Sequence, residues 1–268
     1  MKTNLRIDPS LRMIESFKFS AHRGYKDKSI ENTKESFLKA IEEDLDYIEL
    51  DIRKTKENIP IVFHDKKLNR MFNKKRAKIE NYSLKELKTL AYKDGQKIQT
   101  LEEVLLILKG KIKIIIDIKI EGLESKIIQL IKKYNLMNDV IIQSKRGEII
   151  NNCYRITPSL EYSLYRGYLG KMWAFGDILK IHKILAPIWY YVKVKPYHIN
   201  YINLDGPYIY DDLIMTCHSN GLKIILGSWN VKKYVKYVRK WNVYIINSND
   251  PKKIKEYLNY YRKNGFLK

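Results

Sequence analysis

The chain has 268 residues, 45% of them hydrophobic, which is enough to form the core of one large domain. Its formal net charge is +21, from 51 Lys and Arg residues against 30 Asp and Glu residues. These basic residues occur in short, scattered runs such as 74–76 rather than in one long block. The pattern favours solvated helix faces over a nucleic-acid-binding arm, and it is compatible with a phosphate-bearing partner.

Targeting and redox signals are weak. Cys153 and Cys217 have no zinc-like or disulfide spacing, which favours a reducing, cytoplasmic location. The N-terminus lacks the apolar core of a secretory signal, and no apolar run approaches the ~20 residues of a membrane helix. Residues 1–15 show no clear period, so we expect a leader before a single domain at 16–268.

The first half of the chain alternates between strand-like and helix-like patterns. Short β-branched runs indicate strands, and apolar residues at helical spacing indicate amphipathic helices. Asn32 or Thr33 can cap the first helix, and Ser83 and Thr100 each precede a Glu by three residues, which predicts two capping boxes. The predicted order is strand 17–21, helix 29–45, strands 47–52 and 59–63, helices 83–91 and 100–108, strand 112–120, helix 125–135 and strand 140–144.

The second half continues the alternation less clearly. Its strand candidates are 153–162, 198–205, 222–229 and 243–248, with helices at 211–221 and 231–241. Strands that alternate with helices predict a parallel sheet with crossover helices, here an α/β TIM-type (β/α)8 barrel. Because nine strand candidates exceed the eight of a closed barrel, we expect one near 154 or 199 to be short or outside it. Residues 163–197, rich in Tyr and Trp, are predicted to be an inserted loop or small subdomain.

Charged residues interrupt two of the predicted strands at alternate positions. Glu49 and Asp51 share one face of their strand, and Asp117 and Lys119 repeat this spacing. The carboxyl ends of parallel barrel strands open on one face, so these side chains should converge. Three converging carboxylates repel one another, and a hard divalent cation such as Mg²⁺ or Ca²⁺ would relieve that repulsion.

Further polar or aromatic residues lie at predicted strand ends. His22 and His64 suit an acid/base pair, and Arg23 with Lys119 suits a bound phosphate. Trp229 ends a late strand. Each has a purely structural alternative: a histidine that only stabilises its loop, Asp117 paired with Lys119, or Trp229 in the core. Their coincidence at strand ends favours the functional interpretation.

With these residues in place, the sequence resembles the glycerophosphodiester phosphodiesterase family. The resemblance is strong over residues 17–120 and weaker over 198–251. It consists of a His-Arg-Gly, a Glu-Asn-Thr, a Glu-x-Asp strand and a His-Asp in that order. The matching segments are SAHRG (20–24), IENTKESFLKAI (30–41), YIELDIRKT (47–55), IPIVFHD (59–65), IIIDIK (114–119) and SNDP (248–251).

The resemblance implies a role for each residue. Glu49, Asp51 and Asp117 would hold one divalent cation, although the family usually has Glu at the last position. His22 and His64 would be the acid/base pair, and Arg23, Lys119 and Trp229 would contact the substrate. The implied reaction cleaves a small or polymer-linked glycerophosphodiester to glycerol 3-phosphate and an alcohol.

Other functions remain open from the sequence. A phospholipase D-like or sphingomyelinase D-like enzyme could act on membrane lipids with the same barrel. A barrel that binds a glycerophosphoryl group without cleaving it is a second alternative. A basic nucleic-acid-binding protein is a third, although no nucleic-acid partner is expected because no helix-turn-helix, zinc or aromatic RNA-binding signature is visible. The sequence does not predict the oligomeric state.

Overall fold

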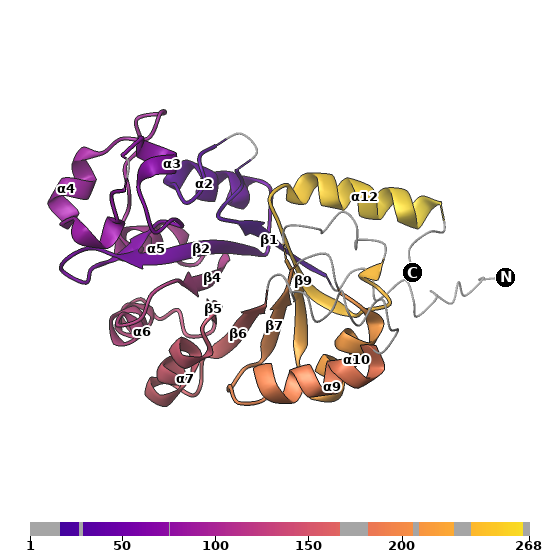
Figure 1. The fold of residues 1–268 in the computed structure, drawn as a ribbon. Helices are drawn as coiled ribbons and strands as arrows, with labels where there is room; N and C mark the ends of the chain where they lie inside the picture. Colours follow the sequence, from indigo (N-terminus) through magenta and orange to yellow (C-terminus); the bar gives the residue numbers. More distant parts are fainter. Residues whose placement is uncertain are drawn as a thin grey trace.

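Eight parallel strands close into a barrel in the computed structural model (Figure 1). The ring closes because the first strand pairs with both the second and the last. The structure describes residues 17–26, 29–74, 76–166, 182–205, 209–227 and 237–264. In order around the barrel, the strands are β1 (Lys18–His22), β2 (Tyr47–Lys54), β4 (Lys113–Ile118), β5 (Val140–Ser144), β6 (Glu161–Arg166), β7 (Tyr201–Leu204), β8 (Lys223–Leu226) and β9 (Val243–Ser248).

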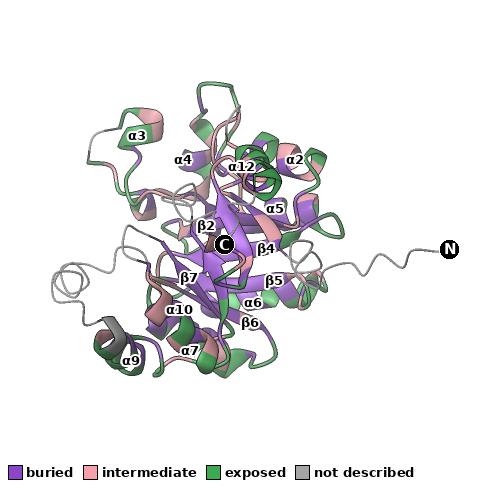
Figure 2. Ribbon diagram, turned by 90° about the vertical axis from the view of Figure 1, so that its right-hand side faces the viewer, coloured by how far each residue is buried: buried purple, intermediate pink, exposed green. Residues whose placement is uncertain are grey.

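Helices cover the outside of the barrel, with their buried faces on the strands and their exposed faces to solvent (Figure 2). The covering helices are α2 (Lys34–Glu42), α5 (Leu101–Leu108), α6 (Glu124–Lys133), α7 (Gly147–Ile156), α9 (His182–Lys193), α10 (Asp211–Ser219) and α12 (Pro251–Lys263). Thr33, Ser83 and Thr100 form the capping boxes at the starts of their helices. The TIM-type fold is therefore confirmed. Within the described ranges no helix has the length and apolarity to span a membrane.

The ninth strand candidate lies elsewhere than predicted. β3 (Pro60–Val62) runs antiparallel to β2 and stands outside the barrel, where it joins the extension formed by α3 (Asn69–Phe72), the 3-10 turn Ile79–Asn81 and α4 (Leu84–Thr89) (Figure 1). Of the two predicted alternatives for a strand near 154 or 199, a place outside the barrel was wrong, whereas β7 is indeed short, with four residues. Residues 147–156 form α7, and β6 begins only at Glu161, while β7 pairs with β6 and β8 within the barrel.

Several predicted features fall partly or wholly outside the described residues. The leader at 1–15, Trp229 and residues 231–236 of the predicted last helix lie there. Residues 167–181 of the predicted insertion also lie outside the described residues. The residues on either side of them form the end of β6 and the helix α9.

The inside of the barrel changes from apolar to polar along its axis. Six inward side chains form an apolar cluster at one level: Tyr47, Ile115, Ile141, Tyr201, Ile225 and Ile245. Side chains alternate along a strand, so the next inward residue lies two positions further on. On those six strands it is Glu49, Asp117, Gln143, Asn203, Gly227 and Asn247. The apolar layer thus closes the barrel floor, and the polar layer above it begins a cavity at the carboxyl ends of the strands.

Candidate active site

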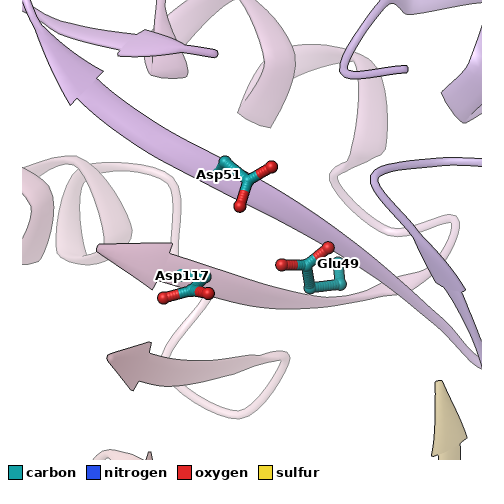
Figure 3. Close-up of side chains that lie close together, drawn as sticks. All are labelled: Glu49, Asp51 and Asp117. Atoms are coloured by element: carbon teal, nitrogen blue, oxygen red, sulfur yellow. The ribbon is translucent and has the colours of Figure 1, made fainter. Parts of the chain in front are cut away.

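Three buried carboxylates meet where β2 and β4 run side by side (Figure 3). Asp51 is the direct partner of Asp117 in the strand register, and Glu49 lies two residues earlier on β2. One oxygen of each carboxylate lies within 4.8 Å of the others. The exposed fractions of Glu49, Asp51 and Asp117 are only 1%, 0% and 3%. The shorter side chain of Asp117 therefore still reaches the cluster that the sequence predicted.

Two cations and an amide surround Asp51. Lys119 Nζ lies 2.8 Å from Asp51 Oδ1 and also donates to Asp117, and Arg23 Nε lies 3.3 Å from Asp51 Oδ2. Asn32 Nδ2 donates to Asp51 Oδ2 at 2.8 Å. Burial alone would raise the pKa of Asp51, but the charges of Lys119 and Arg23 outweigh it and hold that pKa well below its usual range. Asp51 is therefore a carboxylate.

The cluster has a place for a further cation. Burial, and then the charge of Asp51, raises the pKa of Glu49 well above its ordinary value. Asp117 Oδ1 is buried and has no hydrogen-bond partner in the described part of the chain. A buried acceptor without a partner is costly, and three oxygen donors are the ligands that hard divalent cations prefer. The residues present therefore fit a divalent metal ion.

The His-Arg-Gly segment folds back over this cluster in a tight turn. Arg23 has a φ of 62° and Gly24 a φ of 79°. A Cβ at Gly24 would lie 2.2 Å from Ser36 Oγ, so only glycine fits. The turn aims the Arg23 backbone N–H at Glu49 Oε2, at 2.9 Å, and lets the Arg23 side chain reach the carboxylates.

His22 lies at the end of β1 with one ring nitrogen engaged. Its Nδ1 is 2.6 Å from Asn249 Oδ1, which fixes the ring and leaves Nε2 facing Glu49 at 4.0 Å. Burial, and then the charge of Arg23, lowers the pKa of His22 to about 3. Burial and Arg23 thus hold His22 as a neutral imidazole, although the hydrogen bond with Asn249 acts in the opposite direction.

His64 reaches the site by a different route from the one predicted. It follows the antiparallel β3, whose hairpin with β2 brings the chain back to the level of the carboxylates, and Arg53 Nε donates to its carbonyl at 2.9 Å. Its Nδ1 is 2.7 Å from Asp65 Oδ1. Arg70 bonds both Asp65 and Glu31, which in turn accepts from Arg23. An ionic chain therefore connects the surroundings of the two histidines.

The cavity that contains these residues has a second, mostly uncharged side. Gln143, Asn203 and Asn247 line it, together with Tyr165 and Asp205. Sequence reasoning missed all five because amides and single polar residues carry no motif. The available signal was their register, since each of the three amides stands two residues after an inward apolar side chain.

The comparisons with known proteins agree with this geometry. The model of the glycerophosphoryl diester phosphodiesterase family matches residues 22–253. A glycerophosphodiester phosphodiesterase of Caldanaerobacter subterraneus is 29% identical over 259 residues, which are 91% of this chain and 98% of the relative.

Solved structures share the fold. A glycerophosphodiester phosphodiesterase from Parabacteroides distasonis has a TM-score of 0.71 at 21% identity, over 92% of this chain and 98% of that one. An Oleispira antarctica phosphodiesterase, solved with the product sn-glycerol-3-phosphate, has a TM-score of 0.73 at 18% identity, over 90% and 96%. This chain therefore belongs to the glycerophosphoryl diester phosphodiesterase family and is a phosphoric diester hydrolase.

Proposed function

We propose that the protein hydrolyses a glycerophosphodiester to glycerol 3-phosphate and an alcohol, with a divalent cation and a histidine pair. The observation that carries the proposal is that Glu49 and Asp117, clustered with the buried Asp51, line one cavity with two histidines. Family membership supports the substrate class. The reaction needs charge stabilisation on the phosphate and proton transfer at two oxygens, and this cavity contains groups for both.

The three carboxylates would hold the cation, and Mg²⁺ and Ca²⁺ both suit oxygen ligands. When bound, it would supply Lewis-acid stabilisation of the phosphate charge. Arg23 and Lys119 line the same cavity and carry fixed positive charge. Burial alone would lower the pKa of Lys119, but the neighbouring Asp117 and Asp51 raise it, so the ammonium form persists and can share the phosphate charge.

The two histidines differ in the partner of Nδ1, and this difference suggests their roles. Because the neutral amide of Asn249 engages only Nδ1 of His22, Nε2 can accept a proton from the hydroxyl group that attacks the phosphorus. The Asp65 carboxylate lies 2.7 Å from His64 Nδ1 and orients the ring, from which a proton can be donated to the leaving alcohol oxygen. We therefore assign the base to His22 and the acid to His64.

The proposal includes a cytoplasmic location and a small or polymer-linked substrate. Cys153 and Cys217 are both free and buried, which suits a reducing compartment. Because Asp117 joins the acidic cluster despite its shorter side chain, the reason to consider a non-catalytic binding barrel is weakened.

The decisive experiment measures glycerol 3-phosphate release from a panel of glycerophosphodiesters with Mg²⁺, with Ca²⁺ and with EDTA. We expect release that EDTA abolishes, and a loss of about 10³-fold or more in kcat for Glu49→Gln, which keeps the shape of the side chain but removes its charge. Glu102→Gln is the matched control, because Glu102 forms a surface ion pair with Lys133. Undiminished release in EDTA, or near-normal turnover of Glu49→Gln, would contradict the proposal.

A further inference from the structure

Two buried amide oxygens in the active-site cavity lack a hydrogen-bond partner in the described part of the chain: Asn203 Oδ1 and Asn247 Oδ1. Asn203 and Asn247 are only 1% and 2% exposed. Asn203 Nδ2 donates to Gln143 Oε1 at 2.8 Å, and Ser163 Oγ donates to the same oxygen at 3.2 Å. These bonds fix the orientation in which Asn203 turns its oxygen away from Gln143.

The space beside Asn203 Oδ1 is kept open by a glycine. Gly227 belongs to the same cavity lining, at the position where the other strands carry polar side chains. A Cβ there would lie 3.0 Å from Asn203 Oδ1 and 2.5 Å from Asp205 Cβ. Any larger residue would therefore cover the unpartnered oxygen of Asn203.

We propose that Asn203 and Asn247, which we call the amide wall, form a subsite for an uncharged, hydroxyl-bearing arm of the substrate. This inference rests on the proposed function and adds the chemical class of the alcohol on one side of the phosphate. With the phosphate at a cation held by the carboxylates on β2 and β4, an ester arm directed across the cavity would reach Asn203 on β7 and Asn247 on β9. An arm with hydroxyl groups supplies the donors that the two oxygens lack.

The chemistry of the wall also excludes one common type of arm. A trimethylammonium group has no N–H or O–H, so it would leave both amide oxygens desolvated and unpaired. Asp205 lies beside the wall and accepts a hydrogen bond from Tyr165 Oη at 3.3 Å. The wall should therefore discriminate a polyol from choline by the number of donors on the arm.

The test compares glycerophosphoglycerol with glycerophosphocholine in the wild-type protein and in Asn203→Leu and Asn247→Leu, with glycerophosphoethanolamine as a third substrate for the wild type. We expect the wild type to prefer glycerophosphoglycerol in kcat/KM. Each variant should lose about 5- to 20-fold for that substrate, chiefly through KM, and less than about twofold for glycerophosphocholine. Thr157→Val is the matched control, because Thr157 Oγ1 is also buried without a partner but lies outside the cavity.

Three outcomes would overturn the inference. An equal loss for both diesters would mean that the wall contacts the glycerol that they share or only supports the fold. No loss for either would mean that buried water satisfies both oxygens. A wild-type preference for glycerophosphoethanolamine over glycerophosphoglycerol would mean that the wall selects a cation.

Calorimetric binding of the same diesters with Mg²⁺ present separates this inference from the proposed reaction. If the wild type cleaves no diester, the proposed function fails. The inference still stands if glycerophosphoglycerol binds more tightly than glycerophosphocholine and Asn203→Leu removes the difference. It falls if the two bind alike.

Discussion

The two sides of the active-site cavity are built in opposite ways. The charged side lies at the ends of β1, β2 and β4 and of the hairpin strand β3. It consists of His22, Arg23, Glu49, His64, Asp117 and Lys119, with Asp51 buried among the carboxylates. Here most polar groups have partners, and ion pairs fix their positions. On the charged side the unpartnered carboxylate oxygen is Asp117 Oδ1, at the place for the cation, whereas on the amide wall two uncharged acceptors have no partner in the described part of the chain. A preorganised side suits the chemical step, and a side with unmet hydrogen bonds suits recognition of a variable arm.

The largest effect should follow from removing a histidine on the charged side. We expect His22→Ala and His64→Ala each to lower kcat by about 10²- to 10⁴-fold for every diester tested, since both act on the phosphate rather than on the arm. If the assignment of roles is correct, a diester with a good leaving group, such as a nitrophenyl ester, should restore turnover of His64→Ala much more than that of His22→Ala.

The control for this prediction is His218→Ala. His218 lies on α10, where its Nε2 is 2.8 Å from the carbonyl oxygen of Trp241 and outside the cavity. If the loss in kcat of either histidine variant differed between diesters with different alcohols, that histidine would act together with the amide wall. The division of the cavity into two sides would then be wrong.

A pair of glycines tests how tightly each side is packed. Gly24→Ala would force a Cβ to 2.2 Å from Ser36 Oγ at a φ of 79°, so we expect a loss of about 2–4 kcal/mol in the free energy of unfolding. Gly227→Ala meets Asp205 Cβ at 2.5 Å but needs no left-handed backbone, so about 1–2 kcal/mol is expected. Urea denaturation of both variants measures the difference, and equal losses would contradict it.

The charged side was predictable from the sequence, and the amide wall was not. Glu49, Asp51 and Asp117 interrupt apolar strands, where a buried charge needs a reason, whereas an Asn or Gln is common in many contexts. The apolar run at 59–63 was correctly read as strand, but its pattern does not distinguish a parallel barrel strand from the returning arm of a hairpin. Residues 153–156 were read as strand although they end an amphipathic helix, since so short a stretch fits both periods.

The smallest effect concerns the ionic chain behind the charged side, and it depends on pH. Glu31 Oε1 accepts from Arg23 Nη1 at 3.0 Å and from Arg70 Nη2 at 2.6 Å. Burial alone would raise the pKa of Glu31, but the hydrogen bond from Arg70 and the charge of Arg23 outweigh it and lower that pKa. The folded state therefore binds this proton less tightly than the unfolded chain, and the charge of Glu31 stabilises the fold at neutral pH.

Glu31→Gln should consequently lower the free energy of unfolding by about 1 kcal/mol at pH 7. The difference from wild type should shrink as the pH falls below the unfolded value of about 4.3 and through the lower folded pKa. Urea titrations at several pH values measure it, with Glu102→Gln, a surface ion-pair variant, expected to change stability by no more than about 0.5 kcal/mol. A difference that stays constant with pH would mean that Glu31 contributes through its shape rather than its charge. The charged side would then not depend on the ionic chain for its stability.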